Sequence, residues 1–209
     1  MASVFTAIWA AVTGIAVGLA FVPATAADTA QPGPLPRITH LESGVSLPFP
    51  GHATRQVVRP RDTPSGLSML ELTLAPRSLG APPHTHRDED EYFVVMEGAV
   101  MFLNGAEERA APAGTVAILP RGHRHGFWNP HEQPARLLLM VAPGHFESFF
   151  DDVVIRIREE NADTPERIGA ILGQEAAARN VRIEMEHLPV SAHGLRGAPA
   201  LPGSGLSGR

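Results

Sequence analysis

The feature that most constrains the fold is a series of short apolar segments, each followed by turn residues, between positions 54 and 141. In residues 69–74, leucine at every second position alternates with polar residues such as Glu71 and Thr73. This period of two is typical of a β-strand that buries one face. Further strands are predicted at 54–58, 91–96, 99–103, 115–119, 125–128 and 136–141.

The connections between these strands are short and rich in residues that favour turns. Asn104-Gly105 predicts a tight hairpin, and glycine and proline each occur 20 times among the 209 residues. Because no helical pattern interrupts the series, the sequence predicts an all-β fold, an antiparallel sandwich or barrel. A chain of this length suffices for one such domain with additional terminal segments.

Helical patterns follow the predicted strands. From Phe146 to Ile157 apolar residues recur at intervals of three and four, which predicts a helix with one apolar face. A second helix is predicted from Thr164, an N-cap residue followed by Pro165 at the first helical position. The alternation in 181–185 predicts a short terminal strand.

These patterns give the expected boundaries along the chain. We expect residues 146–189 to hold helices, packed outside the barrel, and the short strand. Residues 28–50, rich in proline and glycine, are expected to be a linker, and residues 190–209 a disordered tail.

The N-terminal segment has its own pattern. No charged residue occurs from Val4 to Val22, and Ala24 and Ala26 then fit the small-residue site of a signal peptidase. We therefore expect residues 1–27 to be a signal peptide and the protein to be exported, periplasmic or extracellular. The apolar stretch is also long enough to span a bilayer, and no basic residue precedes it, so an uncleaved membrane anchor is the alternative.

Composition excludes some classes of partner and ligand. The net charge is -5, and the 17 basic residues, all arginine, form no long run, so nucleic acid is not an expected partner. There is no cysteine, which excludes disulfides and thiolate ligands. A metal ion would have to be bound by His, Asp or Glu side chains.

Four residues form the candidate metal site. His84 and His86 are two positions apart, so on a strand both imidazoles face the same side. Glu91 begins an apolar segment after the hydrophilic run 87–90, which can reverse the chain and bring the carboxylate to the same interior. His125 opens another predicted strand and is the fourth donor.

Three imidazoles and one carboxylate suit a borderline divalent metal: Fe, Mn, Ni, Co, Zn or Cu, of which we favour Fe or Mn. In octahedral coordination such an ion would keep two positions for water, substrate or dioxygen.

Several nearby residues have open assignments. Asp90 could take the place of Glu91 if the strand register slips. Glu89 is expected in a solvated turn, and His123 at the rim of the site or beside its ligands. Glu71 either pairs with an arginine on the outer face of its strand or reaches the interior.

Parity also predicts which apolar residues accompany the site. Phe93 and Val95 share a face with Glu91, and Phe127 shares one with His125. These side chains could line a cavity for a flat organic ligand or fill a small barrel as its core. Core packing is the simpler interpretation for most of them.

The spacing of these residues resembles the two motifs of the cupin superfamily. His84-Thr-His86, four residues, Glu91, six residues and Gly98 match the first motif, although Gly80 stands three residues before His84, where the family usually has five. The second motif is matched by Gly114, five residues, Pro120-Arg121-Gly122, two residues, His125, three residues and Asn129.

The resemblance covers roughly residues 50–150 and is greatest to small single-domain bacterial cupins related to quercetin 2,3-dioxygenase. It implies a double-stranded β-helix, or jelly-roll, barrel over residues 51–145, with the metal in its lumen, and often a homodimer.

Two functions of different class follow. In the first, the protein is a metal-dependent dioxygenase acting on a small aromatic or enolisable substrate, with Glu91 as the general base. In the second, it binds a small molecule without catalysis, because fold alone does not imply chemistry. A metal-dependent isomerase or hydrolase is a further alternative.

Overall fold

The computed structural model describes residues 34–197, which form two antiparallel β-sheets containing eleven strands. The six-stranded sheet has the order β1-β2-β3-β10-β5-β8, and the five-stranded sheet has the order β11-β4-β9-β6-β7. The strands are β1 (Val45–Leu47), β2 (His52–Val58), β3 (Ser68–Leu74), β4 (Ser78–His86), β5 (Asp90–Glu97), β6 (Ala99–Asn104), β7 (Glu107–Pro112), β8 (Val116–Leu119), β9 (His125–Asn129), β10 (Ala135–Ala142) and β11 (Val181–Ile183).

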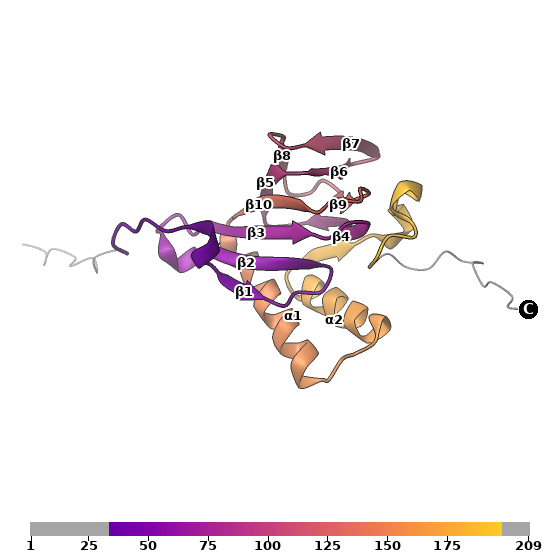
Figure 1. The fold of residues 1–209 in the computed structure, drawn as a ribbon. Helices are drawn as coiled ribbons and strands as arrows, with labels where there is room; N and C mark the ends of the chain where they lie inside the picture. Colours follow the sequence, from indigo (N-terminus) through magenta and orange to yellow (C-terminus); the bar gives the residue numbers. More distant parts are fainter. Residues whose placement is uncertain (1–33, 198–209) are drawn as a thin grey trace, which may run out of the picture. The chain divides into compact units, whose positions relative to one another are not determined.

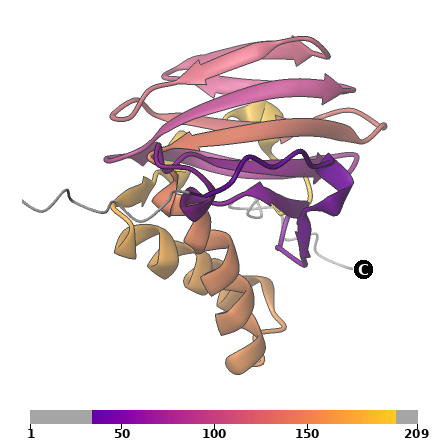
Figure 2. The same cartoon turned by 90° about the vertical axis from the view of Figure 1, so that its left-hand side faces the viewer.

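The chain passes repeatedly from one sheet to the other between β3 and β10, so strands distant in sequence become neighbours (Figure 1). Figure 2 turns the six-stranded sheet toward the viewer, with β10 between β3 and β5. This winding makes the predicted double-stranded β-helix, and the all-β prediction is confirmed.

The core lies between the two sheets and follows the predicted alternation. In β5 and β10 every second residue is buried, among them Phe93, Val95, Leu137 and Leu139, each at most 2% exposed. Full burial of one such side chain contributes about 1.5–3 kcal/mol. The alternation therefore fixes both the register and the face that each strand turns inward.

Aromatic rings fill part of this interior. Phe93 lies 5.0 Å from Phe127 and 5.4 Å from Phe102, measured between ring centroids. Glycine is required beside this cluster, because a Cβ atom on Gly80 would stand only 2.2 Å from the Phe127 ring. The side chains that parity placed inside are thus packed against one another as core.

Both predicted helices are present, α1 (Ser148–Glu159) and α2 (Pro165–Ala178). The Thr164 hydroxyl accepts a hydrogen bond from the backbone N–H of Arg167 at 3.3 Å, so it caps α2 as its sequence position indicated. In Figures 1 and 2 the helices lie beneath the sheets, on the side of β1 and β2. Phe149 and Phe150 of α1 join the barrel core there.

The segment after β11 differs from the expected disordered tail. Residues 190–197 include a 3-10 turn, Val190–Ala192, and lie on the outer face of the five-stranded sheet. That face is apolar, with Leu79 and Trp128 pointing outward, and Leu188 and Leu195 cover it. Burial of this second apolar cluster orders the segment, while residues 198–209 lie outside the described part.

The sequence indicated β4 only at its end, through His84 and His86, and two short strands were not predicted at all. β1 falls in the expected linker, 28–50, and pairs with β2. β7 completes the predicted hairpin at Asn104-Gly105, yet five of its six residues are exposed and it shows no alternation. A strand without a buried face carries no period-two signal.

No helix within residues 34–197 is long and apolar enough to cross a membrane. The predicted signal peptide or anchor, 1–27, lies outside the described residues.

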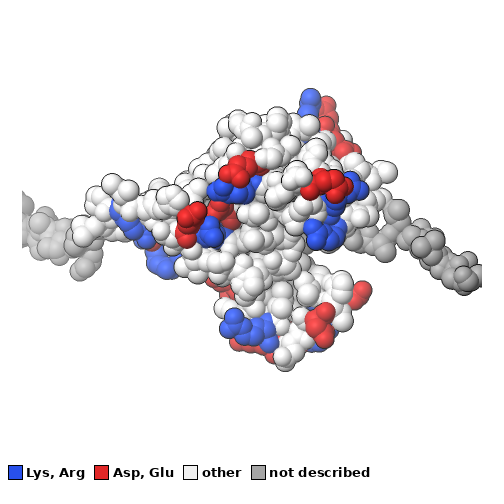
Figure 3. Space-filling view, in the orientation of Figure 1, with Lys and Arg blue, Asp and Glu red and all other residues white. Residues whose placement is uncertain are grey.

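Charged side chains on the face shown in Figure 3 stand mostly in pairs of opposite sign. Among the ion pairs of the described residues, Arg121 contacts Asp90 at 2.8 Å, and Arg136 contacts both Glu71 and Glu97. Arginine thus serves largely to neutralise nearby carboxylates.

Candidate metal centre

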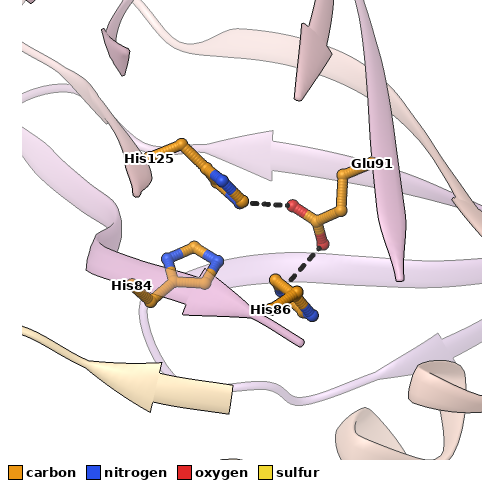
Figure 4. Close-up of side chains that lie close together, drawn as sticks. All are labelled: His84, His86, Glu91 and His125. Atoms are coloured by element: carbon orange, nitrogen blue, oxygen red, sulfur yellow. Dashed lines mark hydrogen bonds and ion pairs between the residues drawn. The ribbon is translucent and has the colours of Figure 1, made fainter. Parts of the chain in front are cut away.

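Three strands bring the four predicted ligands together. His84 and His86 end β4, Glu91 is the second residue of β5, and His125 begins β9. β4 and β9 are paired with His84 opposite His125, which joins the two cupin-like motifs side by side. Figure 4 shows the four side chains pointing toward one another.

The cluster is compact and buried. One nitrogen or oxygen atom from each residue lies within 4.8 Å of the others, and no side chain is more than 8% exposed. The Glu91 carboxylate lies between two imidazoles, with one oxygen 3.2 Å from Nε2 of His125 and the other 3.5 Å from Nε2 of His86. Asp90, the alternative to Glu91, instead pairs with Arg121 away from the cluster.

Hydrogen bonds to Nδ1 determine how two of the rings are protonated. His84 Nδ1 lies 2.8 Å from the carbonyl oxygen of Pro82, and His125 Nδ1 lies 3.0 Å from that of His123. A carbonyl oxygen only accepts, so each Nδ1 carries the hydrogen and donates it. In the neutral ring, the Nε2 lone pair then faces the cluster, which is the arrangement that a metal ligand needs.

His86 has a different partner. Its Nδ1 lies 3.1 Å from a carboxylate oxygen of Glu89, a residue only 7% exposed. The sequence placed Glu89 in a solvated turn, and in the structure it turns inward behind His86. Three acidic residues follow His86 in succession, Asp88, Glu89 and Asp90. The sequence alone does not show which of them turns toward the histidine.

The donor atoms fit a cation. Nε2 of His86 is buried and has no hydrogen-bond partner among the described residues. Nε2 of His125 and the Glu91 carboxylate face each other as two acceptors when the ring is neutral, a repulsive arrangement unless positive charge lies between them. Three imidazole nitrogens and one carboxylate oxygen are a suitable donor set for a divalent transition metal.

The ionisation of the cluster agrees with this interpretation. Burial lowers the pKa of His84 to about 3, assisted by the nearby His125 and His86 rings. Burial alone would raise the pKa of Glu91, but the surrounding imidazoles outweigh it and hold that pKa at about 2. Burial opposes a charge on His86, yet Glu91 and Glu89 raise its pKa above 6.5. The site therefore combines an ionised carboxylate with a neutral imidazole and favours positive charge beside Glu91.

A hollow of about 540 Å³ lies against the outer side of the cluster. Glu89 and Phe146, two of its lining residues, both contact His86, since the Phe146 ring packs edge-on at 4.5 Å. Its other lining residues come from the turn after β4, from the segment before and into α1, and from the end of α2: Asp88, His145, Ser148, Glu175, Ala178, Arg179 and Asn180.

Three other residues, His123, Glu71 and His52, lie outside the four-residue cluster. The His123 side chain is exposed, and its carbonyl oxygen orients His125. Glu71 lies on the outer face of β3, where it pairs with Arg55 and Arg136. His52 begins β2 and is buried against Phe49, with ring centroids 5.0 Å apart.

The fold and the cluster together define a double-stranded β-helix with a candidate three-histidine, one-glutamate metal centre. Residues 70–141 match the family model described as the cupin domain. This range contains all four cluster residues and β3 to β10 almost completely. The chain therefore carries a domain of the cupin superfamily.

Comparison with curated proteins gives partial matches. Germin-like protein subfamily T member 2 of Arabidopsis thaliana is 38% identical over 78 residues, which is 35% of this chain and 35% of that protein. Oxidoreductase iacF of Pestalotiopsis fici is 38% identical over 64 residues, 30% of this chain and 31% of that protein. The chain thus spans about a third of the length of these relatives.

Solved structures give similarly partial matches. The polyketide cyclase RemF from Streptomyces resistomycificus is 21% identical with a TM-score of 0.46, covering 52% of this chain and 80% of that one. KdgF from Halomonas sp. is 17% identical with a TM-score of 0.46, covering 52% of this chain and 94% of that one.

Proposed function

We propose that this protein binds one divalent metal ion, Fe or Mn, through His84, His86, Glu91 and His125, and uses it to oxidise a small organic molecule. The observation that carries the metal site is Nε2 of His86, which is buried among two further imidazoles and a carboxylate and has no hydrogen-bond partner in the described part of the chain. A buried polar atom without a partner costs about 1–3 kcal/mol, which coordination to a cation would remove.

The proposed chemistry needs few protein groups. A divalent ion held by four protein donors would supply Lewis-acid activation of a substrate hydroxyl or enol oxygen, with a second position open for dioxygen. Glu91 is the group suited to accept the proton of that hydroxyl, because its carboxylate is ionised and flanked by two imidazoles. The apolar interior beside it, including Phe93, would exclude water from the reacting atoms.

The oxidative reaction is supported by the partial similarity to an oxidoreductase, Oxidoreductase iacF, and by the resemblance of the motifs to those of quercetin 2,3-dioxygenase-like cupins. A flat aromatic or enolisable substrate is proposed because the Phe146 ring, which packs on His86, also lines the hollow beside the cluster. The same centre in a non-catalytic binding protein would hold a ligand without turnover.

Metal analysis of the purified protein tests the site. We expect about one equivalent of metal in the wild type and its loss in His84→Ala. His123→Ala is the matched control, since it removes an exposed imidazole two residues from His125 but keeps the carbonyl that orients it. Equal metal content in His84→Ala and wild type would exclude the proposed site.

Oxygen consumption tests the reaction. Protein loaded anaerobically with Fe(II) or Mn(II) is expected to consume dioxygen when a flavonol or another enolisable aromatic is added, and His125→Ala is expected not to. Ligand-induced thermal stabilisation without oxygen uptake, retained in His125→Ala, would instead indicate a non-catalytic binding protein.

We further propose that the protein is exported and forms a homodimer. Export rests on the sequence pattern of residues 1–27 alone. The dimer is supported by exposed apolar side chains on the outer face of the six-stranded sheet, among them Val116 and Ile118 of β8.

A further inference from the structure

The three imidazoles of the cluster are not held alike. His84 and His125 each donate Nδ1–H to a backbone carbonyl oxygen, whereas His86 donates to the carboxylate of Glu89 at 3.1 Å. A hydrogen bond to an ionised acceptor is roughly twice as strong as one to a neutral acceptor. His86 therefore has the most strongly fixed ring and the most electron-rich Nε2 of the three.

Glu89 is held in place by the turn that connects β4 with β5. Within this turn, the side chain of Asp88 accepts a hydrogen bond from the Asn180 amide at 2.8 Å, and the backbone N–H of Arg87 donates to the Asn180 carbonyl at 3.2 Å. Asn180 lies two residues after the end of α2, so the chain that leaves this helix anchors the turn at Arg87 and Asp88, just before Glu89. Glu89 is thereby directed inward, toward His86.

Besides contacting His86, Glu89 adjoins the hollow of about 540 Å³. Glu89 is one of its lining residues, whereas none of the four candidate ligands is. A small anion from solution could therefore reach the space beside His86 Nδ1 if the Glu89 side chain were shortened.

From this arrangement we infer that Glu89 is a positioning residue of the metal centre: it fixes the ring and tautomer of His86, and it does so from a hollow that small solutes can enter. The inference rests on the proposed metal site. Hydrogen-bond partners of this kind typically change metal affinity 10–100-fold when they are removed.

The first test measures metal affinity by chelator competition, with the visible spectrum of the Co(II)-loaded protein as a second readout. We expect Glu89→Ala to weaken binding about 10–100-fold and to alter the Co(II) bands. Glu89→Gln keeps an oxygen acceptor of the kind that His84 and His125 already have, so its loss should be smaller. Glu175→Gln is the matched control, because it removes another carboxylate that lines the same hollow but pairs with Arg156 and Arg179 and not with His86.

The second test is rescue by a small carboxylate. Formate or acetate added to Glu89→Ala should restore most of the affinity and the wild-type Co(II) spectrum, whereas chloride at equal ionic strength should not. His84→Ala should not respond to either anion. A purely structural role for Glu89 would show no such selectivity.

The outcomes separate the two proposals. If the wild type binds no metal, the proposed function fails and this inference fails with it. If the wild type and Glu175→Gln bind metal, and Glu89→Gln and Glu89→Ala bind it as tightly as the wild type, only the role of Glu89 is overturned. Should Glu89→Ala not fold, the isosteric Glu89→Gln still decides, through its affinity and Co(II) spectrum.

Discussion

At the scale of single residues, the sequence predicted the convergence of the four candidate ligands better than the burial of the groups around them. Parity along a strand placed His84 and His86 on one face and Glu91 inside, and the structure has them there. Glu89 and His52 are also buried, but neither belongs to an alternation of apolar and polar residues that would have indicated it, since the alternately buried residues of β2 begin with the polar His52, Thr54 and Gln56. Their burial depends on contacts with distant segments, which local periodicity does not contain.

His52 makes stability depend on pH. Burial lowers its pKa from 6.5 to about 4, so the unfolded chain takes up the proton first as the pH falls. Stability is therefore lost progressively from about pH 6.5 down to pH 4, by roughly 3 kcal/mol in total, and this contribution is constant below that range. In His52→Phe this part of the pH dependence should vanish.

Urea unfolding between pH 4 and 7 measures this effect as the difference between wild type and variant. His40→Phe is the control, because it makes the same replacement at an exposed histidine. Parallel pH profiles for wild type and His52→Phe would contradict a buried neutral imidazole.

Glu71 illustrates a buried charge that holds two arginines. It is 4% exposed and contacts Arg55 at 2.8 Å and Arg136 at 2.7 Å. In Glu71→Ala both guanidinium groups lose this partner, and we expect a loss of about 1–3 kcal/mol, reduced from the fully buried case because both arginines are partly exposed. Glu97→Ala removes an exposed partner of the same Arg136 and should cost less than about 1 kcal/mol. Equal unfolding free energies for the two variants would show that the burial of Glu71 is immaterial.

At the scale of elements, prediction succeeded where one face of a strand or helix is buried. The alternation in 69–74 and the cap at Thr164 correspond to β3 and α2. It failed for β7, whose faces are mostly exposed, and for residues 190–197, whose order depends on an outward-facing tryptophan in β9. The segment expected to be a disordered tail covers the outer face of the five-stranded sheet there.

The segment that covers this face should contribute to stability. A chain ending at His187 lacks Leu188 and Leu195, which pack on Trp128, now 1% exposed. We expect a lower melting temperature and a red-shifted tryptophan emission, because Trp128 would become exposed to water. The Trp9→Phe background makes Trp128 the one remaining tryptophan.

A chain ending at Gly197 is the matched control for that truncation, since it keeps every residue of the described segment. It should have the emission and melting temperature of the full chain. An unshifted emission from the chain ending at His187 would mean that the segment is not what shields Trp128.

At the scale of the whole molecule, the outer faces of the two sheets differ. The outer face of the five-stranded sheet is covered by its own chain. The six-stranded sheet, turned toward the viewer in Figure 2, has exposed apolar residues on its outer face. Val116 and Ile118 of β8 are 59% and 65% exposed, and they stand opposite Val94 and Tyr92 of β5. Partly buried Met140 of β10 continues the row beside Tyr92.

Ion pairs border this apolar face at both ends, Arg121 with Asp90 and Arg136 with Glu97. An apolar centre with a polar rim of both signs is the usual composition of a protein interface, and a two-fold axis brings one such face against its own copy. We therefore expect the protein to be a dimer, with twice the 22.3 kDa chain mass when the full chain is present.

Ile118→Arg tests the dimer by light scattering after size exclusion. Two added charges at the centre of a two-fold interface would be desolvated and would repel each other, so the variant should elute as a monomer at concentrations where the wild type is dimeric. Val190→Arg is the matched control, because Val190 is an aliphatic residue, 82% exposed, on the segment that follows β11. It should remain dimeric, and a dimeric Ile118→Arg, or a wild type that is monomeric at tens of micromolar, would contradict this face as the interface.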